Sequence, residues 1–463
     1  MKLAAVILAA GQGTRMKTRL PKVLHPVVGK PMVWYALETV AALGCDQTVL
    51  VVGHGADQVR DTISNLQSPI SNFQPSISTL QFAEQREQRG TGHAVLQARD
   101  ALRGKSDAVF IVYGDMPLLR AETLKKLTDL HASSRATITL LTLVADDSMA
   151  FGRIVRDANK RVLGIVEERD ATPEQLAIRE LNCGVYCFDA AWLWDRLAHL
   201  QPTGAQNEYY LTDLVALAVR ENRAIETMVS RDAEEMLGIN TRVQLVQAEK
   251  IMRARINDAL MLSGVTLIDP ATTYIEPDVT IGEDTIIEPN THLRGKTRIG
   301  ANCRIGPNAI IRDAQIGDEC AIVASDVTES IIEARVQIGP FARLRAGTHL
   351  ARAVRIGNFG EVKNSRVGEK SHIGHFSYVG DADLGARVNI GAGTITCNYD
   401  GKRKNRTLIG DDVFIGSDTL LIAPVTIGAR ARTGAGAVVN KDVPADSLAV
   451  GVPARVIRKL NDK

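Results

Sequence analysis

A turn rich in glycine and basic residues follows the first apolar segment of the chain. Residues 8–22 read LAAGQGTRMKTRLPK and contain two glycines, two arginines and two lysines. Backbone N–H groups of a glycine-rich turn can approach an anion closely, and Arg15 and Lys22 can neutralise the charge of a phosphate. A glycine turn with solvated basic side chains is the alternative interpretation. The spacing up to Pro21 and Lys22 favours a site for a phosphate-bearing ligand.

Further polar residues in the first half of the chain extend this site. Asp115 follows the apolar run AVFIVYG, and a carboxylate there suits Mg²⁺, which prefers oxygen ligands and is often shared with phosphates. A helix-capping aspartate is the alternative. The segment QREQRGTGHA, residues 85–94, offers a polar edge for a nucleotide base. Gly152, Glu167 and Asn182 lie in three short polar turns; together they suit a hydroxylated sugar, although each alone is explained as a turn residue.

A second polar set lies between residues 345 and 404. It combines cationic, imidazole, phenol and amide groups, on Arg345, Lys363, His375, Tyr378, Asn389 and Lys404. With a reference pKa of about 6.5, a histidine can act as a general base at neutral pH. A histidine met alone is more often structural, but the polar neighbours of His375 favour a second site.

The elements that must position the first set alternate between strand-like and helix-like segments. Apolar strand-like runs cover 4–10, 48–53, 108–115, 136–144 and 183–188, and helix-like segments cover 31–44 and 90–104. This alternation predicts an α/β layer with a mostly parallel sheet, in which ligands bind at the carboxyl ends of the strands. Gly44 is placed to end the first helix. The proline-broken segment 67–79 is predicted to be a surface loop insertion.

The second polar set lies in a repeat. Residues 242–264 have the apolar spacing of one connecting helix. After Val265 an aliphatic residue precedes a glycine fourteen times, many of the intervals being 6, 12 or 18 residues. This hexapeptide pattern predicts a parallel β-helix, in which residues about 15 to 18 apart stack on one face. The second polar set would therefore lie in successive coils.

Bulk composition limits the remaining possibilities. A chain of 463 residues exceeds one core, so two or three domains are expected. The net charge of +2 and the 4% aromatic content argue against nucleic acid or an anionic membrane as a partner. Without a long apolar run or a signal-peptide pattern, a soluble cytoplasmic protein is expected. Six cysteines without a C-x-x-C pair indicate reduced thiols rather than a zinc site.

The run 8–22 matches the sugar-nucleotidyltransferase signature L-x-x-G-x-G-T-R-(x)-P-K almost residue for residue. With its hexapeptide repeats, the full chain resembles the bacterial bifunctional N-acetylglucosamine-1-phosphate uridylyltransferase and glucosamine-1-phosphate N-acetyltransferase family. The resemblance implies a Rossmann-like nucleotidyltransferase domain over 1–241, a linker helix over 242–264 and a left-handed parallel β-helix acetyltransferase domain over 265–463. It also implies synthesis of UDP-N-acetylglucosamine for the peptidoglycan and lipopolysaccharide of the cell envelope, with acetyl-CoA and UTP as co-substrates.

Carried over position by position, the resemblance assigns the first polar set to UTP, the sugar and Mg²⁺. The nucleotide would be held by Leu8, Ala9, Ala10, Gly11, Lys22, Gln85, Gly90 and Thr91. The sugar would be lined by Tyr113, Gly114, Gly152, Glu167 and Asn182. Asp115 and Asn240 would bind Mg²⁺, while Arg15 and Lys22 neutralise charge during catalysis. Because the attacking phosphate oxygen is already anionic at neutral pH, no general base and no nucleophilic Ser or Cys is expected.

In the β-helix the resemblance implies that His375 deprotonates the amino sugar. The sugar phosphate would be bound by Arg345 and Lys363, and the sugar would be held by Tyr378, Asn389 and Lys404. Acetyl-CoA would be contacted by Ala392, Asn398, Tyr399, Ser417 and Ala435. A homotrimer with sites between neighbouring β-helices is also implied. Gly451 stands where some members of the family place an arginine that touches coenzyme A, so Arg455 or Arg458 would have to substitute. The basic run KRKNR, residues 402–406, is either a solvated turn or a grip on the phosphates of coenzyme A.

Two other functions stay open at this point. One is a sugar nucleotidyltransferase with a single activity, whose β-helix only oligomerises or senses ligands. The other is a regulatory subunit without activity, which would be expected to lose Lys22 or Asp115, yet both are present. The polar set between residues 345 and 404 favours two activities, because a pure scaffold does not need it.

Overall fold

The computed structural model describes residues 1–66, 80–146, 151–204 and 207–460. The chain forms two compact units, Met1–Met252 and Arg253–Lys463. The surface loop predicted at 67–79 lies outside the described residues. Among the described helices, none is both long enough and apolar enough to cross a membrane.

The first unit is built on a nine-stranded sheet with the strand order β11-β7-β10-β6-β1-β4-β5. These strands are β1 (Leu3–Ala9), β4 (Gln47–Val52), β5 (Leu80–Glu84), β6 (Ala108–Tyr113), β7 (Ile138–Val144), β10 (Glu180–Asp189) and β11 (Ile225–Ser230). β8 (Arg153–Arg156) and β9 (Val162–Val166) attach beside β10. Four of the pairings are parallel, whereas β10 runs antiparallel to both of its main neighbours. The predicted parallel arrangement is confirmed for β6, β1, β4 and β5, whereas the antiparallel pairings of β8, β9 and β10 make half of the eight pairings antiparallel.

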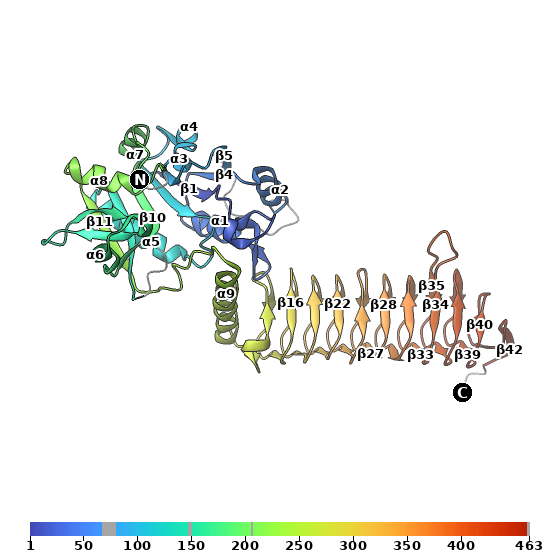
Figure 1. The fold of residues 1–463 in the computed structure, drawn as a ribbon. Coiled ribbons are helices and arrows are strands. Elements are labelled where there is room, and N and C mark those ends of the chain that lie inside the picture. The colour runs from blue at the N-terminus through green and yellow to red at the C-terminus, as the bar shows by residue number, and fades with distance from the viewer. Residues whose placement is uncertain (67–79, 147–150, 205–206, 461–463) are drawn as a thin grey trace. The chain divides into compact units, whose positions relative to one another are not determined.

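Helices cover this sheet so that both of its faces are apolar and buried (Figure 1). The α-helices described before α9 are α1 (Met32–Ala42), α2 (Ala56–Leu66), α3 (Thr91–Leu96), α4 (Arg99–Leu102), α5 (Ala121–Ser134), α6 (Pro173–Leu176), α7 (Ala190–Leu197) and α8 (Asp213–Arg220), and α6 buries none of its residues. Along β1, alternate side chains enter two separate apolar layers, with Ala5 and Ile7 on one side and Val6 and Leu8 on the other. A strand buried on both faces explains why this segment reads as a continuous apolar run.

One helix prediction is correct and one is wrong. The helix expected over 31–44 is α1, and Gly44 follows its end with φ 68°. The single helix expected over 90–104 is split into α3 and α4. Between them, the N–H groups of Gln97 and Ala98 bond to carbonyls three residues back, at 3.2 and 3.0 Å. This tighter 3₁₀-type turn interrupts the α-helical ladder.

Helix α9 (Arg242–Leu262) contains the boundary between the two compact units. Near its start, the Arg242 side chain donates to the Met16 carbonyl at 3.2 Å within the first unit. Near its end, the buried Asn257 amide donates to the carbonyls of Pro270 and Thr273, at 3.0 and 3.3 Å, within the second unit.

The second unit is a coil of short strands that stack into three parallel sheets of 12, 10 and 9 strands (Figure 1). From β12 (Thr266–Leu267), β13 (Tyr274–Ile275) and β14 (Thr280–Ile281) up to β40 (Val438–Val439), every third strand belongs to the same sheet. Of the fourteen aliphatic residues that precede a glycine, all but Ile281 are buried, and Ile281 packs against the same core. The predicted parallel β-helix is confirmed. Its last strand, β42 (Arg455–Lys459), pairs antiparallel with β41 (Ser447–Val450).

Candidate active sites

The glycine-rich turn leaves the carboxyl end of β1, at the centre of the sheet. It contains two 3₁₀ turns, Thr14–Met16 and Lys22–Leu24, and Gly13 between β1 and Lys22 has φ 63°. A Cβ atom on Gly13 would lie 2.6 Å from the Cβ of Lys22, so only glycine lets the Lys22 side chain lie across this turn. The space beside Gly11 is open, because a Cβ atom there would have no neighbour within 4 Å. An anion can therefore reach the Gly11 backbone.

The two ends of the predicted nucleotide loop differ in exposure. The side chains of Leu8, Ala9 and Ala10 are buried in the core, so only their backbone is available to a ligand. Arg15 is exposed in the first 3₁₀ turn and has no ion-pair partner within the described part of the chain. Its guanidinium is therefore available to an incoming anion.

Three residues from distant parts of the chain meet at this edge of the sheet. The Lys22 ammonium donates to the Asp115 carboxylate and, at 2.9 Å, to Oδ1 of Asn240. Asp115 follows β6 and Asn240 precedes α9, 93 and 218 residues along the chain from Lys22. The side chains of Lys22 and Asp115 are only 12% and 16% exposed. Sheet topology thus gathers both predicted metal ligands around one lysine.

The donor set at this cluster fits Mg²⁺. Asp115 and Asn240 offer two hard oxygen atoms, and Mg²⁺ is usually bound through one or two protein oxygens together with waters and substrate phosphates. Across the described residues, no group of three or more His, Cys, Asp or Glu side chains could hold a metal ion by itself. The protein oxygens therefore suit an ion that arrives with phosphate ligands.

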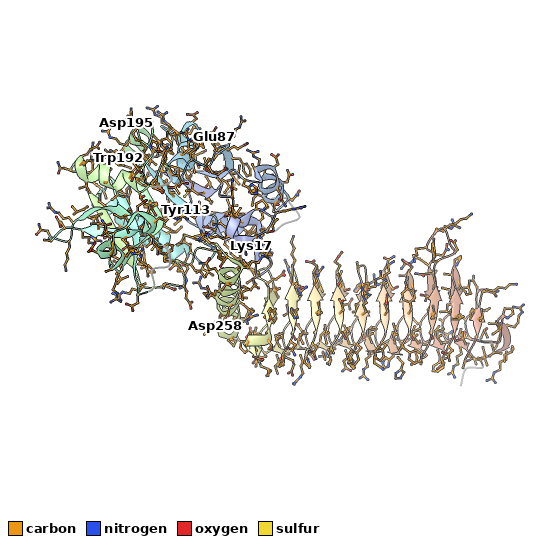
Figure 2. The ribbon with its side chains drawn as sticks, in the orientation of Figure 1. Lys17, Glu87, Tyr113, Trp192, Asp195 and Asp258 are labelled. Atoms are coloured by element: carbon orange, nitrogen blue, oxygen red, sulfur yellow. The ribbon has the colours of Figure 1, made fainter. Side chains whose placement is uncertain are left out.

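The residues predicted for the sugar lie next to this cluster. Tyr113, labelled in Figure 2, ends β6, and its ring covers Gly184, where a Cβ atom would lie 2.8 Å from the ring. Asn182 lies near the start of β10, and because β10 is antiparallel to β6, this start is at the edge where β6 ends. The sequence indicated a short polar turn at Asn182, but this residue lies inside β10, at the edge of the sheet where β6 ends.

Backbone contacts bring the remaining sugar residues to Asn182. The Asn182 N–H donates to the Gly152 carbonyl at 2.9 Å, and the Asn182 amide donates to the Tyr186 hydroxyl at 2.7 Å. A Cβ atom on Gly152 would lie 3.5 Å from a carboxylate oxygen of Glu167. The N–H of Gly114 donates to the Leu8 carbonyl at 2.9 Å.

Burial controls the charge of the two titratable groups here. Burial raises the pKa of Glu167, the Thr212 hydroxyl that donates to it at 2.9 Å lowers it, and Asp170 and Asp213 raise it again. Burial, helped by the charges of Glu167 and Asp115, also raises the pKa of the Tyr113 phenol. Tyr113 is therefore a neutral hydrogen-bonding group at physiological pH.

The residues predicted to hold the base form a connected group. The Gln85 side chain is 4% exposed and donates to the Gly90 carbonyl at 3.0 Å, and its amide nitrogen lies 3.1 Å from Nδ1 of His93. Gly90 has φ 102°, and a Cβ atom there would lie 2.7 Å from the Tyr209 carbonyl. The Thr91 hydroxyl accepts from the Leu211 N–H at 3.0 Å.

His93 and Tyr209 were not identified from the sequence. Their rings lie 6.1 Å apart beside Gln85, and Arg89 is positioned over the Tyr209 ring at 5.1 Å. The position of His93 within QRGTGHA was the available signal. Tyr209 had none, because it reaches this group from 120 residues farther along the chain than Arg89.

In the β-helix, several predicted residues share the outer face of the ten-stranded sheet. β25 (Arg343–Leu344), β28 (Glu361–Lys363), β31 (Tyr378–Gly380) and β34 (Ile395–Cys397) are consecutive in it. Glu361 pairs with Tyr378, and Lys363 pairs with Gly380, while Arg345 donates to Glu361 at 2.9 Å. Within the described residues, the Lys363 ammonium has no hydrogen-bond or ion-pair partner.

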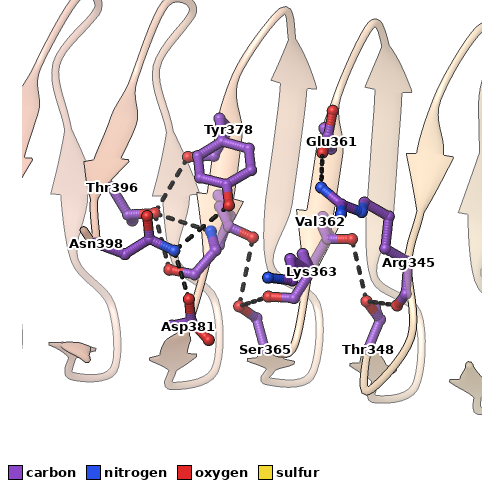
Figure 3. A network of polar contacts seen from close by, with 12 residues as sticks. Arg345, Thr348, Glu361, Val362, Lys363, Ser365, Tyr378, Asp381, Thr396 and Asn398 are labelled. Atoms are coloured by element: carbon purple, nitrogen blue, oxygen red, sulfur yellow. Dashed lines mark hydrogen bonds and ion pairs between the residues drawn. The ribbon is translucent and has the colours of Figure 1, made fainter. Parts of the chain in front are cut away.

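A buried carboxylate organises the Tyr378 region (Figure 3). Asp381 is 4% exposed and accepts from the amides of Asn364 and Asn398, both at 2.5 Å. The Asn398 amide also lies 3.4 Å from the Tyr378 hydroxyl, as donor. A Cβ atom on Gly380 would lie only 2.3 Å from this hydroxyl, so the glycine makes room for the phenol.

Neither Gly380 nor Asp381 was predicted from the sequence. Gly380 was counted among the repeat glycines, which hid its particular contact with Tyr378. Asn398, expected to touch acetyl-CoA, is 5% exposed and lies beneath the surface as a partner of Asp381.

His375 ends β30 (His372–His375) in the twelve-stranded sheet. It pairs in register with Asn358 of β27 (Arg355–Asn358), and its Nδ1 lies 3.2 Å from Oδ1 of Asn358. The side chain is exposed. In the tautomer in which Nδ1 donates to Asn358, Nε2 keeps its lone pair and faces solvent.

Three of the five residues predicted for acetyl-CoA, Ala392, Ser417 and Ala435, occupy one corner of successive coils. Ala392 and Ser417 each lie two residues beyond an in-register buried isoleucine, as His375 does, and Ala435 lies two beyond Thr433 in the next coil. The Asp418 N–H donates to the Ala392 carbonyl at 2.7 Å, and the Gly436 N–H donates to the Ser417 carbonyl at 2.8 Å.

Two further predicted residues lie near this corner. Gly451, two residues beyond Ala449 in the last coil, extends the column with φ 98°. Asn389 starts β33 (Asn389–Ile390) and pairs with His372 rather than His375. Asn389 therefore lies beside the His375 column and not within it.

Tyr399 and Lys404 lie on a loop that projects between β34 and β35 (Thr407–Ile409) (Figure 1). They bridge the loop, and the Lys404 ammonium is 5.0 Å from the centre of the Tyr399 ring. Arg406 binds the Asp383 carboxylate through two hydrogen bonds of 2.9 and 2.6 Å. Within the run 402–406, Arg406 therefore holds the base of the loop, whereas Lys402 and Arg403 remain exposed.

Asp400 shapes the tip of this loop. Its carboxylate accepts from the N–H groups of Lys402 and Arg403, each at 2.8 Å, and from the Asn405 amide at 3.0 Å. These hydrogen bonds lower the pKa of Asp400 to about 2, so it is ionised at neutral pH.

A glycine-rich, basic loop at the carboxyl edge of an α/β sheet, followed by a hexapeptide β-helix, is the architecture of a nucleotidyltransferase joined to a second transferase domain. Residues 5–205 match the MobA-like NTP transferase domain, and residues 278–313 and 406–441 match the bacterial transferase hexapeptide repeats. The chain is 48% identical to the bifunctional protein GlmU of Pelobacter propionicus over 99% of this chain and 97% of that protein.

Other GlmU proteins match equally fully. Those of Trichlorobacter lovleyi and an Exiguobacterium species are 48% and 46% identical, over 96% and 97% of this chain and 95% and 97% of theirs. A solved UDP-glucose pyrophosphorylase in complex with UDP-glucose is 20% identical over 55% of this chain and 100% of its own, with a TM-score of 0.45. The chain belongs to the GlmU family of bifunctional proteins, and it is a nucleotidyltransferase and glucosamine-1-phosphate N-acetyltransferase that makes UDP-N-acetylglucosamine.

Proposed function

We propose that the two sites described above carry out the two reactions in sequence. The β-helix moves the acetyl group of acetyl-CoA to the amine of glucosamine-1-phosphate. The first unit then joins the resulting N-acetylglucosamine-1-phosphate to UTP and releases diphosphate. The observation that carries the proposal is the meeting of Lys22, Asp115 and Asn240 beside an open glycine loop.

In the first unit, the proposed mechanism consists of alignment and charge neutralisation. An oxygen of the sugar phosphate attacks the α-phosphorus of UTP, and the bond from this phosphorus to the diphosphate leaving group breaks. Arg15 and Lys22 hold the phosphates, Gln85, Gly90 and Thr91 hold the base, and Asp115 and Asn240 would hold Mg²⁺. When bound, Mg²⁺ supplies positive charge against the phosphate oxygens.

The sugar is proposed to lie against Tyr113, Gly152, Glu167 and Asn182. Tyr113 stays neutral and Asn182 is fixed by its contacts with Gly152 and Tyr186, so both keep their orientation for sugar hydroxyl groups. Such fixed groups place the attacking phosphate oxygen in line without further ordering.

On the β-helix, His375 is proposed to act as the general base. Its Nε2 removes a proton from the ammonium of the amino sugar, and the free amine attacks the thioester carbonyl. The C–S bond then breaks, and the departing thiolate of coenzyme A takes up the second proton that the nitrogen loses as it becomes an amide. Hydrogen bonding of Nδ1 to Asn358 supports this role, because it fixes the tautomer that has a free Nε2. Arg345 and Lys363 are proposed to bind the sugar phosphate, and Tyr378 to hold the sugar.

We propose that the β-helix assembles into a homotrimer, and an exposed aromatic column supports this. Phe341, Phe359 and Phe376 occupy one corner of successive coils and are 60%, 59% and 59% exposed. Phe341 and Phe359 have φ 60° and 57°, a left-handed conformation that bulky residues avoid. In other coils the same corner position is occupied by Asn308 and Asp418, which have φ 59° and 54°.

A strained, exposed aromatic residue is stabilising only when another surface covers it. The proposed cover is a second copy of this chain. Phe359→Asn relieves the strained backbone and removes the apolar contact, so a smaller species is expected in light scattering. An unchanged mass would mean that this corner is not part of the interface.

One reaction mixture tests the proposed sequence of reactions. Purified protein receives glucosamine-1-phosphate, acetyl-CoA, UTP and Mg²⁺, and free thiol and diphosphate are followed in time. Thiol release followed by diphosphate release is expected. If thiol never appears, but diphosphate forms once N-acetylglucosamine-1-phosphate is supplied, the β-helix does not catalyse acetyl transfer and the single-activity alternative replaces the proposal.

The functional division into 1–241, 242–264 and 265–463 remains part of this proposal. The position of α9 and the two compact units supports it. The reactions are proposed to take place in the cytoplasm, and the six free cysteines fit a reducing compartment.

A further inference from the structure

Lys22 contacts the same two oxygen-bearing side chains that are proposed to hold the metal. Its ammonium donates to the Asp115 carboxylate and to Asn240 Oδ1, in a place where both charged side chains are largely buried. A buried carboxylate without a cation would be costly. In the protein without nucleotide, Lys22 supplies this cation.

We infer that Lys22 is a built-in substitute for the divalent cation, released only when a nucleotide phosphate takes up its ammonium. This inference rests on the proposed metal role of Asp115 and Asn240. An ammonium that contacts a carboxylate oxygen of Asp115 and Oδ1 of Asn240 repels a divalent cation placed at the same side chains. The two protein ligands therefore bind the cation more tightly once Lys22 has left them.

The packing of Lys22 makes this exchange a local movement. A Cβ atom on Gly13 would lie 2.6 Å from Cβ, and 3.3 Å from both Cγ and Cδ, of Lys22. The aliphatic stem thus lies along the glycine turn that is proposed to bind the phosphates. Rotation about the last bonds of the side chain is enough to move the ammonium from the carboxylate to a phosphate, so it exchanges one anion for another.

The exchange predicts an order of binding. Without nucleotide, the site should hold a divalent cation weakly, since the ion must displace Lys22 and finds only two protein ligands. With nucleotide, the phosphates both draw Lys22 away and add oxygen ligands. The metal should therefore bind with the nucleotide or after it, and removing the lysine charge should remove part of this dependence.

Mn²⁺ is a suitable probe, because free Mn²⁺ is counted by electron paramagnetic resonance without any turnover. The full chain is titrated with Mn²⁺, with and without UTP, as wild type and as Lys22→Met. Without UTP, Lys22→Met is expected to bind Mn²⁺ at least about tenfold more tightly than wild type, the equivalent of about 1.4 kcal/mol. Lys22→Arg keeps the cation and is expected to bind weakly, like wild type.

Two further variants locate the effect. Lys17→Met removes an exposed charge from the same loop and should leave Mn²⁺ binding unchanged. Lys22→Met combined with Asp115→Ala should lose the gain in affinity. Thermal melts of all variants confirm that each one is folded.

The possible failures differ from one another. Equal or weaker Mn²⁺ binding by Lys22→Met, while both proteins bind Mn²⁺ in the presence of UTP, would overturn the inference and leave the proposed metal site intact. Absence of Mn²⁺ binding in every protein, even with UTP, would overturn the metal site itself. A gain that survives Asp115→Ala would place the metal elsewhere and also overturn the inference.

Discussion

The two candidate sites are assembled in opposite ways. In the first unit, Lys22, Asp115 and Asn240 come from three distant parts of the chain. The Lys22 ammonium contacts both of the other side chains directly, and Lys22 and Asp115 are largely shielded from solvent. In the β-helix, Arg345, Lys363 and His375 come from neighbouring coils and lie on an outer surface.

The first site is therefore formed by segments that are distant in the sequence, whereas the second is formed by equivalent positions in successive coils. The first site exists only because the whole sheet brings its ends together, so its groups already satisfy one another within one chain. The second site follows from the coil, which places each group one step from the next and leaves the cationic groups and His375 facing outward. Such a surface leaves room for a neighbouring chain to complete it, as the exposed phenylalanine column also suggests.

The strongest test of this separation is to remove the proposed base. His375→Ala should lower acetyl transfer by about 10²–10⁴-fold, because the variant loses the proposed general base. Uridylyl transfer, measured with N-acetylglucosamine-1-phosphate and UTP, should stay unchanged. Equal loss of both activities would show that the sites are not independent.

A substitution in the first unit should have the opposite selectivity, with loss of uridylyl transfer but not of acetyl transfer. Lys22→Met should lower uridylyl transfer by about 10²–10³-fold, the usual cost of losing one group that stabilises transition-state charge. Thiol release from acetyl-CoA should continue at the wild-type rate. A variant that forms diphosphate at the normal rate would exclude Lys22 from catalysis.

A third variant, with a smaller expected effect, tests whether Tyr378 on the β-helix surface binds the sugar. Gly380→Ala places a methyl group where the Tyr378 hydroxyl lies, 2.3 Å away, so the phenol must move. We expect acetyl transfer to fall about tenfold through a higher KM for glucosamine-1-phosphate, which corresponds to one lost hydrogen bond of about 1.4 kcal/mol. Tyr378→Phe, which keeps the ring in place, separates loss of the hydroxyl from displacement of the ring. An unchanged KM in both variants would exclude Tyr378 from sugar binding.

The smallest expected effect concerns stability in the first unit. Because the pKa of Glu167 is raised in the folded protein, the folded state binds this proton more tightly than the unfolded chain does, and the associated stability is lost as pH rises through the folded pKa. Glu167→Gln should therefore stabilise the first unit at pH 7.5, by up to about 1 kcal/mol. In thermal unfolding, the gap to wild type should narrow as pH falls toward 4. A constant gap across this range would mean that titration of Glu167 is not the cause.

The fold was predictable from the sequence where one local rule repeats. In each aliphatic–glycine pair the aliphatic side chain points into the core, so the six-residue spacing of these pairs in the sequence predicts the β-helix. The split of the helix expected over 90–104 was not predictable, because no glycine or proline marks the tightened turn at Gln97 and Ala98.

The sequence predicted many of the residues of both sites but not all of the contacts between them. The glycine turn and its basic residues carry a local signature, but the position of Lys22 between Asp115 and Asn240 depends on sheet topology that spans 218 residues. In the β-helix, the spacing placed the residues of one face in successive coils. The spacing could not identify Asp381 or Gly380. Their roles depend on particular contacts, namely Asp381 with Asn398 and Gly380 with the Tyr378 hydroxyl.

The projecting loop between β34 and β35 bears on how such enzymes acquire new chemistry. Asp383 pairs with Arg366 of the preceding coil, 17 residues earlier, whereas Leu408 pairs with Asp383 across 25 residues, and both rungs keep their register. The extra residues leave the coil at a corner and return without disturbing the apolar column. Residues can therefore be inserted at one corner of a coil during evolution, and can bring new side chains to the surface, while the β-helix core stays unchanged.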